Sequence, residues 1–339
     1  MSKRSSILKE NMDANNSNSS TSDAWSDLTT PSMEWIFRVL CSALFLLGIF
    51  GNGAVCFVIA VKQRLRTTTN LLVLNLAAAD FIFVALYTLT QFSSLENNYS
   101  WEMGSAVCKL TYTVLPTCLS SAVGSLLCIA LFRYKAVSNP FHMRVGLSYK
   151  TTAVLVIAIW LVSLLTTLPV LLVAKITDYR DKIFCHEAWP IDKPYKEMYW
   201  VFVFLIQYAV PLVVIVSLST ATVIKVKQSR ARVLPSASKT DTDSRPNVLN
   251  ASIRQRRRQE SNMSKVLICL VILYAMSMLP QHVVFFWLTY GDLSKQKYTL
   301  YIFTIASIFP IVNSVLNPLI YGSLHKELKT VFKNCLKCP

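Results

Sequence analysis

The chain has 339 residues, of which 53% are hydrophobic and only 15% are charged. Soluble globular proteins carry about 25% charged residues, so this composition excludes an ordinary soluble protein and indicates several membrane crossings. The formal net charge of +16 would suit a nucleic-acid-binding protein, but the basic residues gather in short segments between apolar stretches, a pattern typical of membrane topology.

Residues 1–34 are polar, rich in Ser and Asn, and contain no apolar segment of the kind found in a signal peptide. We therefore expect a disordered amino-terminal tail, with membrane insertion relying on the first apolar stretch. Asn-x-Ser sequons occur in this tail at Asn15 and Asn18, and a third lies at Asn98. These three asparagines are candidate glycosylation sites if their segments face the cell exterior.

Seven apolar stretches follow the tail, each long enough to cross a bilayer, which requires about 20 helical residues. Few or no charged residues interrupt them, and no internal repeat is visible. Their approximate limits are 35–61, 70–93, 106–131, 152–174, 198–224, 265–290 and 298–321. The sequence therefore predicts an all-α fold, a seven-transmembrane helix bundle over residues 35–322.

The distribution of Lys and Arg assigns the two sides of the membrane. Basic residues concentrate after the first, third, fifth and seventh stretches, whereas the alternate loops are nearly balanced in charge. Because basic loops stay in the cytoplasm, we expect a multi-pass plasma membrane protein with an extracellular amino terminus.

The last segment, 323–339, has apolar residues at helical spacing with lysines between them. This pattern predicts a short amphipathic helix on the membrane surface, followed by a short cytoplasmic tail. Cys335 and Cys338 stand beside lysines and are candidate palmitoylation sites, because a second anchor holds such a helix to the membrane. Unmodified cysteines near the chain end are the alternative.

Residues in all seven stretches carry a resemblance to a known family. The second stretch contains LNLAAAD with Asp80, the third closes with Arg133 and Tyr134, and the seventh reads NSVLNPLIY. Further matching positions are Asn52, Trp160, Pro211, Pro280, Asn313, Ser314, Asn317, Pro318 and Tyr321. Over roughly residues 35–338 the chain resembles the rhodopsin-like (class A) G-protein-coupled receptors, and it looks like their peptide-receptor branch.

The resemblance implies a disulfide and a set of switch residues. Cys108 and Cys185 match the bond that ties the third span to the second outer loop, and both lie on the oxidising side of the membrane. In the family, the arginine at position 133 reaches the G protein, and an acid placed like Glu260 pairs with it across the helices. The residues implied in coupling and switching are Arg133, Tyr134, Glu260, Pro280, Asn317, Pro318 and Tyr321.

Asp80 is an acid within a membrane span, which is costly unless polar partners surround it. The resemblance assigns it to a polar core that holds a sodium ion in the family, together with Asn52, Asn313 and Ser314. The family's usual serine on the third span is here Ala122, with Ser121 and Ser125 nearby. A core with sodium and a hydrogen-bonded core without an ion both remain open, and no other cofactor is expected.

Four switch positions depart from the family pattern. Phe132 replaces the acid before Arg133, and Arg133 lies near enough to the end of its span to reach cytoplasmic water. The other three departures are Met278 for tryptophan, Tyr274 for phenylalanine and Ser219 for tyrosine. Modified, constitutive and weak signalling are all compatible with these changes.

The class of ligand follows from residues that are missing as well as present. Leu115 stands where amine receptors of this family carry a carboxylate, and the span 298–321 has no lysine to hold retinal. Polar and aromatic residues reach the outer ends of the spans, and such a wide polar mouth suits a peptide. The ligand-contact candidates are Gln91, Leu115, Gln207, Gln281, His282 and Phe285, with ordinary helix packing as the alternative for each.

We therefore expect a receptor that binds an extracellular neuropeptide or peptide hormone and activates a heterotrimeric G protein, with arrestin and a receptor kinase as further partners. A receptor-like scavenging protein with weak or no coupling is the alternative, suggested by Phe132, Met278 and Ser219. No nucleophile–base pair or metal cluster emerges from the sequence, so we expect neither an enzyme nor a metalloprotein. We expect no nucleic acid partner.

Overall fold

The residues described by the computed structural model are 31–138, 147–179, 182–190, 194–233, 246–290 and 299–324. Within them, the segment 246–263 is described by its backbone alone. The chain divides into two compact units, residues 1–41 and 42–339. The described part of the first unit is the start of one helix, and the second unit holds the other described elements.

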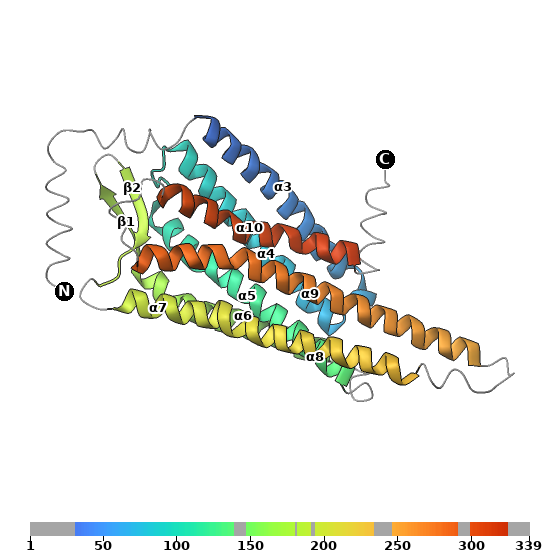
Figure 1. Ribbon diagram of the computed structural model, residues 1–339. Helices are drawn as coiled ribbons and strands as arrows, with labels where there is room; N and C mark the ends of the chain where they lie inside the picture. The colour runs from blue at the N-terminus through green and yellow to red at the C-terminus, as the bar shows by residue number, and fades with distance from the viewer. Residues whose placement is uncertain are drawn as a thin grey trace, which may run out of the picture. The chain divides into compact units, whose positions relative to one another are not determined.

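Helices account for nearly all of the described chain (Figure 1). In chain order the elements are α3 (Pro31–Val61), η1 (Gln63–Leu65), α4 (Thr68–Glu96), α5 (Gly104–Ser138), α6 (Tyr149–Val173), β1 (Ala174–Tyr179), β2 (Lys182–Glu187), α7 (Tyr195–Phe204), the π-helical turn η3 (Leu205–Ala209), α8 (Val210–Val233), α9 (Pro246–Tyr290) and α10 (Thr299–Leu324).

Seven helical segments of the described chain are long and apolar enough to cross a membrane, which confirms the predicted seven-helix bundle. The fifth span is composite, because α7, η3 and α8 follow one another without a break. The helices extend beyond their predicted limits, and among the largest extensions are those of α5, which continues to Ser138, and α9, which begins at Pro246. A helix satisfies its backbone hydrogen bonds internally, between residues four apart. It can therefore continue into polar sequence beyond the bilayer.

Helix α3 begins four residues before the predicted start of the bundle at residue 35. Residues 31–34 were expected in the tail, but they form the first turn of α3. Pro31 is compatible with that position because the first helical residues need no amide donor. The remaining tail residues, 1–30, and the predicted surface helix after Leu324 lie outside the described residues, so both stay predictions.

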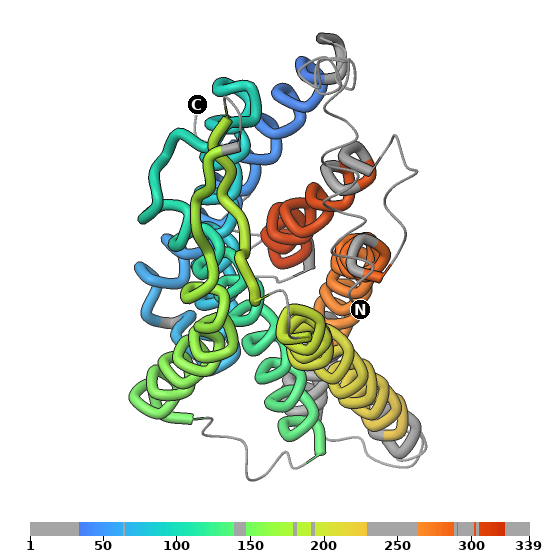
Figure 2. The backbone as a smooth tube through the Cα atoms, turned by 90° about the vertical axis from the view of Figure 1, so that its left-hand side faces the viewer, coloured from blue at the N-terminus to red at the C-terminus, as the bar shows by residue number. Residues whose placement is uncertain are grey.

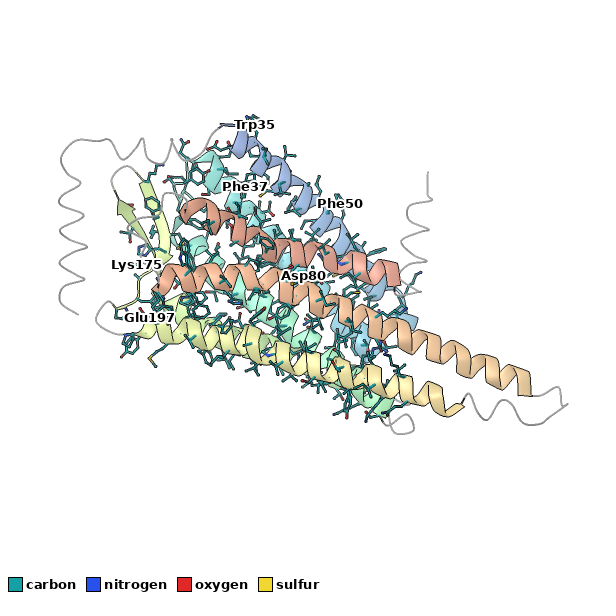
Figure 3. All side chains as sticks on the ribbon, in the orientation of Figure 1. Trp35, Phe37, Phe50, Asp80, Lys175 and Glu197 are labelled. Atoms are coloured by element: carbon teal, nitrogen blue, oxygen red, sulfur yellow. A yellow bond between two sulfur atoms is a disulfide. The ribbon has the colours of Figure 1, made fainter. Side chains whose placement is uncertain are left out.

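Helix α5 occupies the centre of the bundle and contacts α4, α6 and α8, as the view from the hairpin in Figure 2 shows. Leu72 of α4, Ile215 of α8 and Leu267 of α9 are among the fully buried side chains of the bundle. Large apolar side chains also point outward, among them Phe50, labelled in Figure 3, which is 71% exposed. Lipid tails are as apolar as such side chains, so this exposure is compatible with a membrane and not with water.

The sequence analysis did not predict the β-hairpin. Strands β1 and β2 are antiparallel, with Ile176 opposite Cys185, and they lie at the end of the bundle where α7 begins (Figure 1). The amide of Trp101 donates to the carbonyl of Ile183 over 2.7 Å and joins β2 to the loop before α5. We call this end of the bundle the hairpin end. The opposite end, where α5 and α8 finish, we call the basic end.

Candidate functional site

The structure contains the predicted disulfide between Cys108 and Cys185, whose Cα atoms are 5.7 Å apart. Cys108 lies in the second turn of α5 and is fully buried. One turn further along α5, the Tyr112 hydroxyl donates to the Cys185 carbonyl over 3.3 Å. These two links hold β2 against α5 at the hairpin end.

Glu187, the last residue of β2, is positioned by two tryptophans. Its Oε2 atom accepts a hydrogen bond from Trp189 Nε1 over 2.6 Å and another from Trp200 Nε1 over 3.1 Å. Trp200 belongs to α7, and its ring lies 4.6 Å from the ring of Phe285 on α9. The carboxylate therefore connects the hairpin with α7, and through the Trp200 ring with α9.

A series of aromatic rings, which we call the aromatic column, continues from Trp200 along α7, η3 and α9. Its ring-centroid distances are 4.6 Å for Trp200–Phe285, 6.1 Å for Phe285–Phe286, 5.1 Å for Phe286–Phe204, 5.3 Å for Phe204–His282, 4.9 Å for His282–Tyr208 and 5.8 Å for Tyr208–Tyr274. These separations lie in the range of favourable aromatic pairs. A contact at the hairpin end can therefore change packing deep in the bundle.

Two tyrosines at the inner end of the column join η3 and α9. The Tyr208 hydroxyl donates to the Ala275 carbonyl over 3.1 Å, and the Tyr274 hydroxyl donates to the Gln207 carbonyl. Pro211 has no amide hydrogen, so the carbonyl four residues earlier, that of Gln207, cannot accept the usual α-helical bond from position 211. The Tyr274 hydroxyl supplies a donor from another helix.

Only some of the predicted ligand contacts come together. His282 and Phe285 belong to the aromatic column, and Gln207 lies beside it in η3 with a buried Nε2 atom that has no acceptor among the described residues. Leu115 packs instead against a separate hydrophobic cluster of α3, α4, α5 and α10. Gln91 on α4 and Gln281 on α9 are half-buried.

The predicted polar core is assembled from α3, α4 and α10. Asp80 is 1% exposed, lies inside the bundle in Figure 3, and its Oδ2 accepts from Asn317 Nδ2 over 2.7 Å. Asn52 Nδ2 donates to the carbonyls of Gly48 and Ser314, each over 3.0 Å. Asn313 is also buried. The polar groups that an intramembrane acid requires are therefore present.

Two oxygen atoms of this core favour a cation. Asn52 Oδ1 and Asn313 Oδ1 are buried and accept no hydrogen bond from the described residues. Oxygen ligands suit hard cations, and the Asp80 carboxylate supplies the charge. The residues of α3, α4 and α10 thus fit a small cation such as sodium.

Helix α5 adds no oxygen where the family usually has one, because Ala122 is a buried alanine. The nearby hydroxyls of Ser121 and Ser125 accept hydrogen bonds from Asn75 Nδ2, over 3.3 Å and 2.8 Å. Asn75 Oδ1 in turn accepts from Trp160 Nε1 over 2.7 Å. Both serines therefore belong to a link between α4, α5 and α6.

At the basic end, Phe132 packs against the main hydrophobic core, whereas Arg133 is half-buried beside it. Lys225 of α8 lies 4.6 Å from the ring centre of Tyr134 and donates to Ser138 Oγ over 2.7 Å. These contacts join α5 to α8. The Glu260 side chain lies outside the described part of α9, so its pairing with Arg133 stays a prediction.

The other switch positions lie inside the bundle. Met278 and Tyr274 belong to the main core, and the buried Ser219 Oγ has no hydrogen-bond partner among the described residues. Tyr321 is 2% exposed, and its hydroxyl likewise has no hydrogen-bond partner among the described residues. Three prolines interrupt the backbone hydrogen bonds of the last two spans: Pro280 in α9, and Pro310 and Pro318 in α10.

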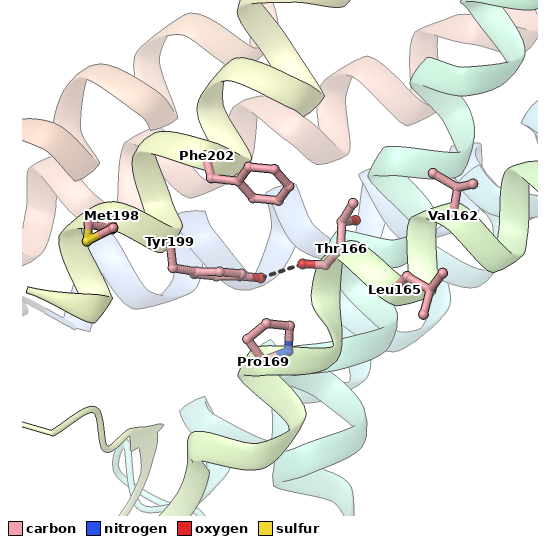
Figure 4. A pocket seen from close by; sticks show the side chains of 7 residues that line it. All are labelled: Val162, Leu165, Thr166, Pro169, Met198, Tyr199 and Phe202. Atoms are coloured by element: carbon pink, nitrogen blue, oxygen red, sulfur yellow. Dashed lines mark hydrogen bonds between the residues drawn. The ribbon is translucent and has the colours of Figure 1, made fainter.

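A separate hollow lies between α6 and α7 (Figure 4). It has a volume of about 460 Å³, and Leu165, Pro169 and Phe202 are among its lining residues. The Tyr199 hydroxyl bridges it by donating to the Thr166 carbonyl over 3.1 Å. Because its lining is apolar and belongs to two membrane spans, this hollow offers few groups to a polar ligand.

The predicted modification sites remain predictions. Asn98 is exposed and lies in a turn with a positive φ of 50°, near the start of α5, so its side chain is accessible. Asn15, Asn18, Cys335 and Cys338 lie outside the described residues.

Comparisons with known proteins agree with this architecture. Residues 51–321 match the family model described as "7 transmembrane receptor (rhodopsin family)". The neuropeptide Y receptor type 6 of Oryctolagus cuniculus is 27% identical over 94% of this chain and 86% of its own length. The neuropeptide FF receptor 1 of Rattus norvegicus is 28% identical, with coverage of 86% and 67%. The neuromedin-K receptor of Oryctolagus cuniculus is 25% identical, with coverage of 86% and 59%.

Proposed function

This chain belongs to the rhodopsin family of seven-transmembrane receptors, and we propose that it binds an extracellular peptide and activates a heterotrimeric G protein. The names of its relatives, which include neuropeptide Y and neuropeptide FF receptors, support a peptide ligand. The observation that carries the proposal is the aromatic column from Trp200 to Tyr274. It connects the end that would receive the ligand with α9, the helix that contains Pro280.

Ligand binding acts in this proposal by shifting a population of states. A ligand favours whichever state it binds more tightly, so it must contact groups that differ between states. A peptide seated against Trp200 and Phe285 contacts α7 and α9 together. Movement of α9 relative to η3 then requires the bonds made by Tyr208 and Tyr274 to break or rearrange.

The basic end would receive the G protein. Arg133 and Tyr134 lie there on α5, and Lys225 of α8 covers the Tyr134 ring. Outward movement of α9 would open this end to a protein partner and give Arg133 a new environment. Arrestin and a receptor kinase are further proposed partners.

The proposed orientation places the hairpin end and the amino terminus outside the cell. The disulfide between Cys108 and Cys185 supports this, because such bonds persist in oxidising surroundings. Lys62, Lys135, Lys150 and Lys225 lie at the opposite end, as expected for a cytoplasmic face. Plasma membrane localisation follows from this orientation and from an extracellular ligand.

We also propose that sodium acts as an allosteric ligand of the polar core. Asp80 would supply the charge, with oxygen atoms of Asn52, Asn313 and Ser314 nearby. A bound cation would neutralise the buried carboxylate and stabilise the resting arrangement. The hydrogen bond from Asn317 to Asp80 already orients that carboxylate from α10.

The test is second-messenger output in cells that express the chain, exposed to a library of synthetic neuropeptides. An Arg133→Ala variant with matched surface expression is the control for coupling. Output that depends on one peptide and on Arg133 supports the proposal. Saturable peptide binding with no second-messenger change, even when several G proteins are co-expressed, would instead support the scavenging function.

A further inference from the structure

Among the described residues, Glu187 is a carboxylate held by hydrogen-bond donors and not by an ion pair. Both indole donors, Trp189 and Trp200, use the same oxygen atom, Oε2. Within the described chain, Oε1 accepts no hydrogen bond and no Lys, Arg or His side chain forms an ion pair with this carboxylate. An indole N–H has no net charge, so these two donors orient the carboxylate without pairing it with a cation of the described residues.

The walls around this carboxylate are aromatic. The rings of Trp189 and Tyr199 lie 5.2 Å apart, and those of Tyr199 and Trp200 lie 5.3 Å apart. Tyr112 belongs to the same cluster and is half-buried beside it. Aromatic faces attract cations, and tryptophan attracts them most strongly. A carboxylate held among such faces is a combination that favours a cationic group.

The carboxylate is also held in a fixed place. The disulfide to Cys108 anchors β2 two residues before Glu187, and the carbonyl of Val173 accepts from the amide of Ala188 over 2.9 Å just after it. With the backbone fixed on both sides and two donors on Oε2, Oε1 has a preferred orientation. Such preorganisation lowers the entropy that binding would otherwise cost.

We propose that Glu187 and the rings of Trp189, Tyr199 and Trp200 form a subsite for a guanidinium or ammonium group of the ligand. The subsite rests on the proposed function, since it assigns a basic group to the proposed peptide. The cation would bind at Oε1 and against the tryptophan faces, while Oε2 keeps its indole donors. Binding there would also contact Trp200, the first ring of the aromatic column.

The first test needs no knowledge of the peptide. The purified full-length receptor is titrated with N-acetyl-argininamide and with N-acetyl-citrullinamide, a neutral analogue of the same shape, while thermal stability is followed. We expect stabilisation by the arginine compound alone, and loss of that stabilisation in Glu187→Gln. Equal responses to both compounds, or an unchanged response in Glu187→Gln, would overturn the subsite.

The control variant is Asp178→Asn, which removes an exposed acid from the same hairpin, on β1. It should leave the arginine response unchanged, whereas a general effect of hairpin charge would weaken it too. Glutamine keeps an acceptor for the two indoles, so Glu187→Gln should reach the cell surface as well as the unmodified chain. Glu187→Asp is a second variant that retains charge and should retain part of the response.

The second test separates this inference from the proposed function. Peptides active in the library are resynthesised with each Arg or Lys replaced by citrulline or acetyl-lysine, or with an acetylated amino terminus. We expect one replacement to reduce potency about 10- to 100-fold in the unmodified receptor and to have little further effect in Glu187→Gln. Active peptides that tolerate every replacement would contradict the subsite alone. A library without any active peptide would contradict the proposed function, and the fragment titration would still decide the subsite.

Discussion

Tyr208 and Tyr274 donate hydrogen bonds in opposite directions across one helix interface. The Tyr208 hydroxyl reaches from η3 to the carbonyl of Ala275 on α9, and the Tyr274 hydroxyl reaches from α9 to the carbonyl of Gln207 on η3. Pro211 provides no amide to the second acceptor, so the usual α-helical bond to it is absent. A phenylalanine at position 274, which the family pattern favours, would remove the Tyr274 donor from that carbonyl.

We expect Tyr274→Phe to raise signalling in the absence of ligand. The variant removes one interhelical hydrogen bond, which contributes about 1 kcal/mol and corresponds to about a fivefold shift between two states. Basal second-messenger output, normalised to surface expression, measures the effect. Tyr87→Phe is the matched control, because the Tyr87 hydroxyl also bridges two spans, bonding Ser307 over 3.1 Å. Equal changes in both variants would refute a specific role for the tyrosine pair.

Phe132→Asp should lower basal output about threefold, because it restores an acid beside Arg133 and a partly exposed ion pair contributes up to about 1 kcal/mol. Phe132 also packs against the main core, so part of any effect comes from lost packing. Phe132→Leu keeps an apolar side chain and serves as the control. If the leucine and aspartate variants lower output equally, the charge has no role at this position.

The polar core predicts a sodium effect that depends on position 122. Ala122→Ser adds a hydroxyl from α5 to the oxygen atoms near Asp80, so it should strengthen sodium binding and weaken peptide affinity in sodium about fivefold or more. Competition binding in sodium and in an N-methylglucamine buffer measures the difference. Asp80→Asn should abolish the sodium effect in both backgrounds. A sodium effect that survives Asp80→Asn would show that the ion acts elsewhere.

Loss of the disulfide should abolish most surface expression. Cys108 and Cys185 are separated by 77 residues, and removal of such a bond typically costs about 2–5 kcal/mol. The double variant Cys108→Ser/Cys185→Ser avoids a free thiol at the hairpin end, and flow cytometry of an epitope-tagged chain measures the outcome. Cys269→Ser, which changes an exposed free cysteine of α9, should be expressed normally. Normal expression of the double variant would show that the other hairpin contacts are sufficient.

Local properties of the sequence were enough to predict the bundle. Each span is recognisable because about 20 consecutive apolar residues are long enough to cross a bilayer as a helix, whichever helices pack beside them. Each basic loop indicates which end of its span faces the cytoplasm. The resemblance supplied the pairing of Cys108 with Cys185 and the polar core around Asp80, and the structure contains the disulfide and a hydrogen bond from Asn317 to Asp80. It also drew attention to Tyr274 and Phe132 as departures, although it did not indicate what they contact.

Only the tertiary structure decided the contacts that distinguish the site. The β-hairpin was missed because its strands are short and mixed in composition, and the disulfide and bonds such as Trp101–Ile183 hold it in place. Leu115, a predicted ligand contact, is partly buried against a cluster of α3, α4, α5 and α10, because the rotation of a helix about its axis is set by its neighbours. Glu187 carries no motif of its own; its importance arises from Trp200 on another element. Sequence determines which segments cross the membrane, whereas helix packing determines which side chains meet, since those side chains are far apart in the chain.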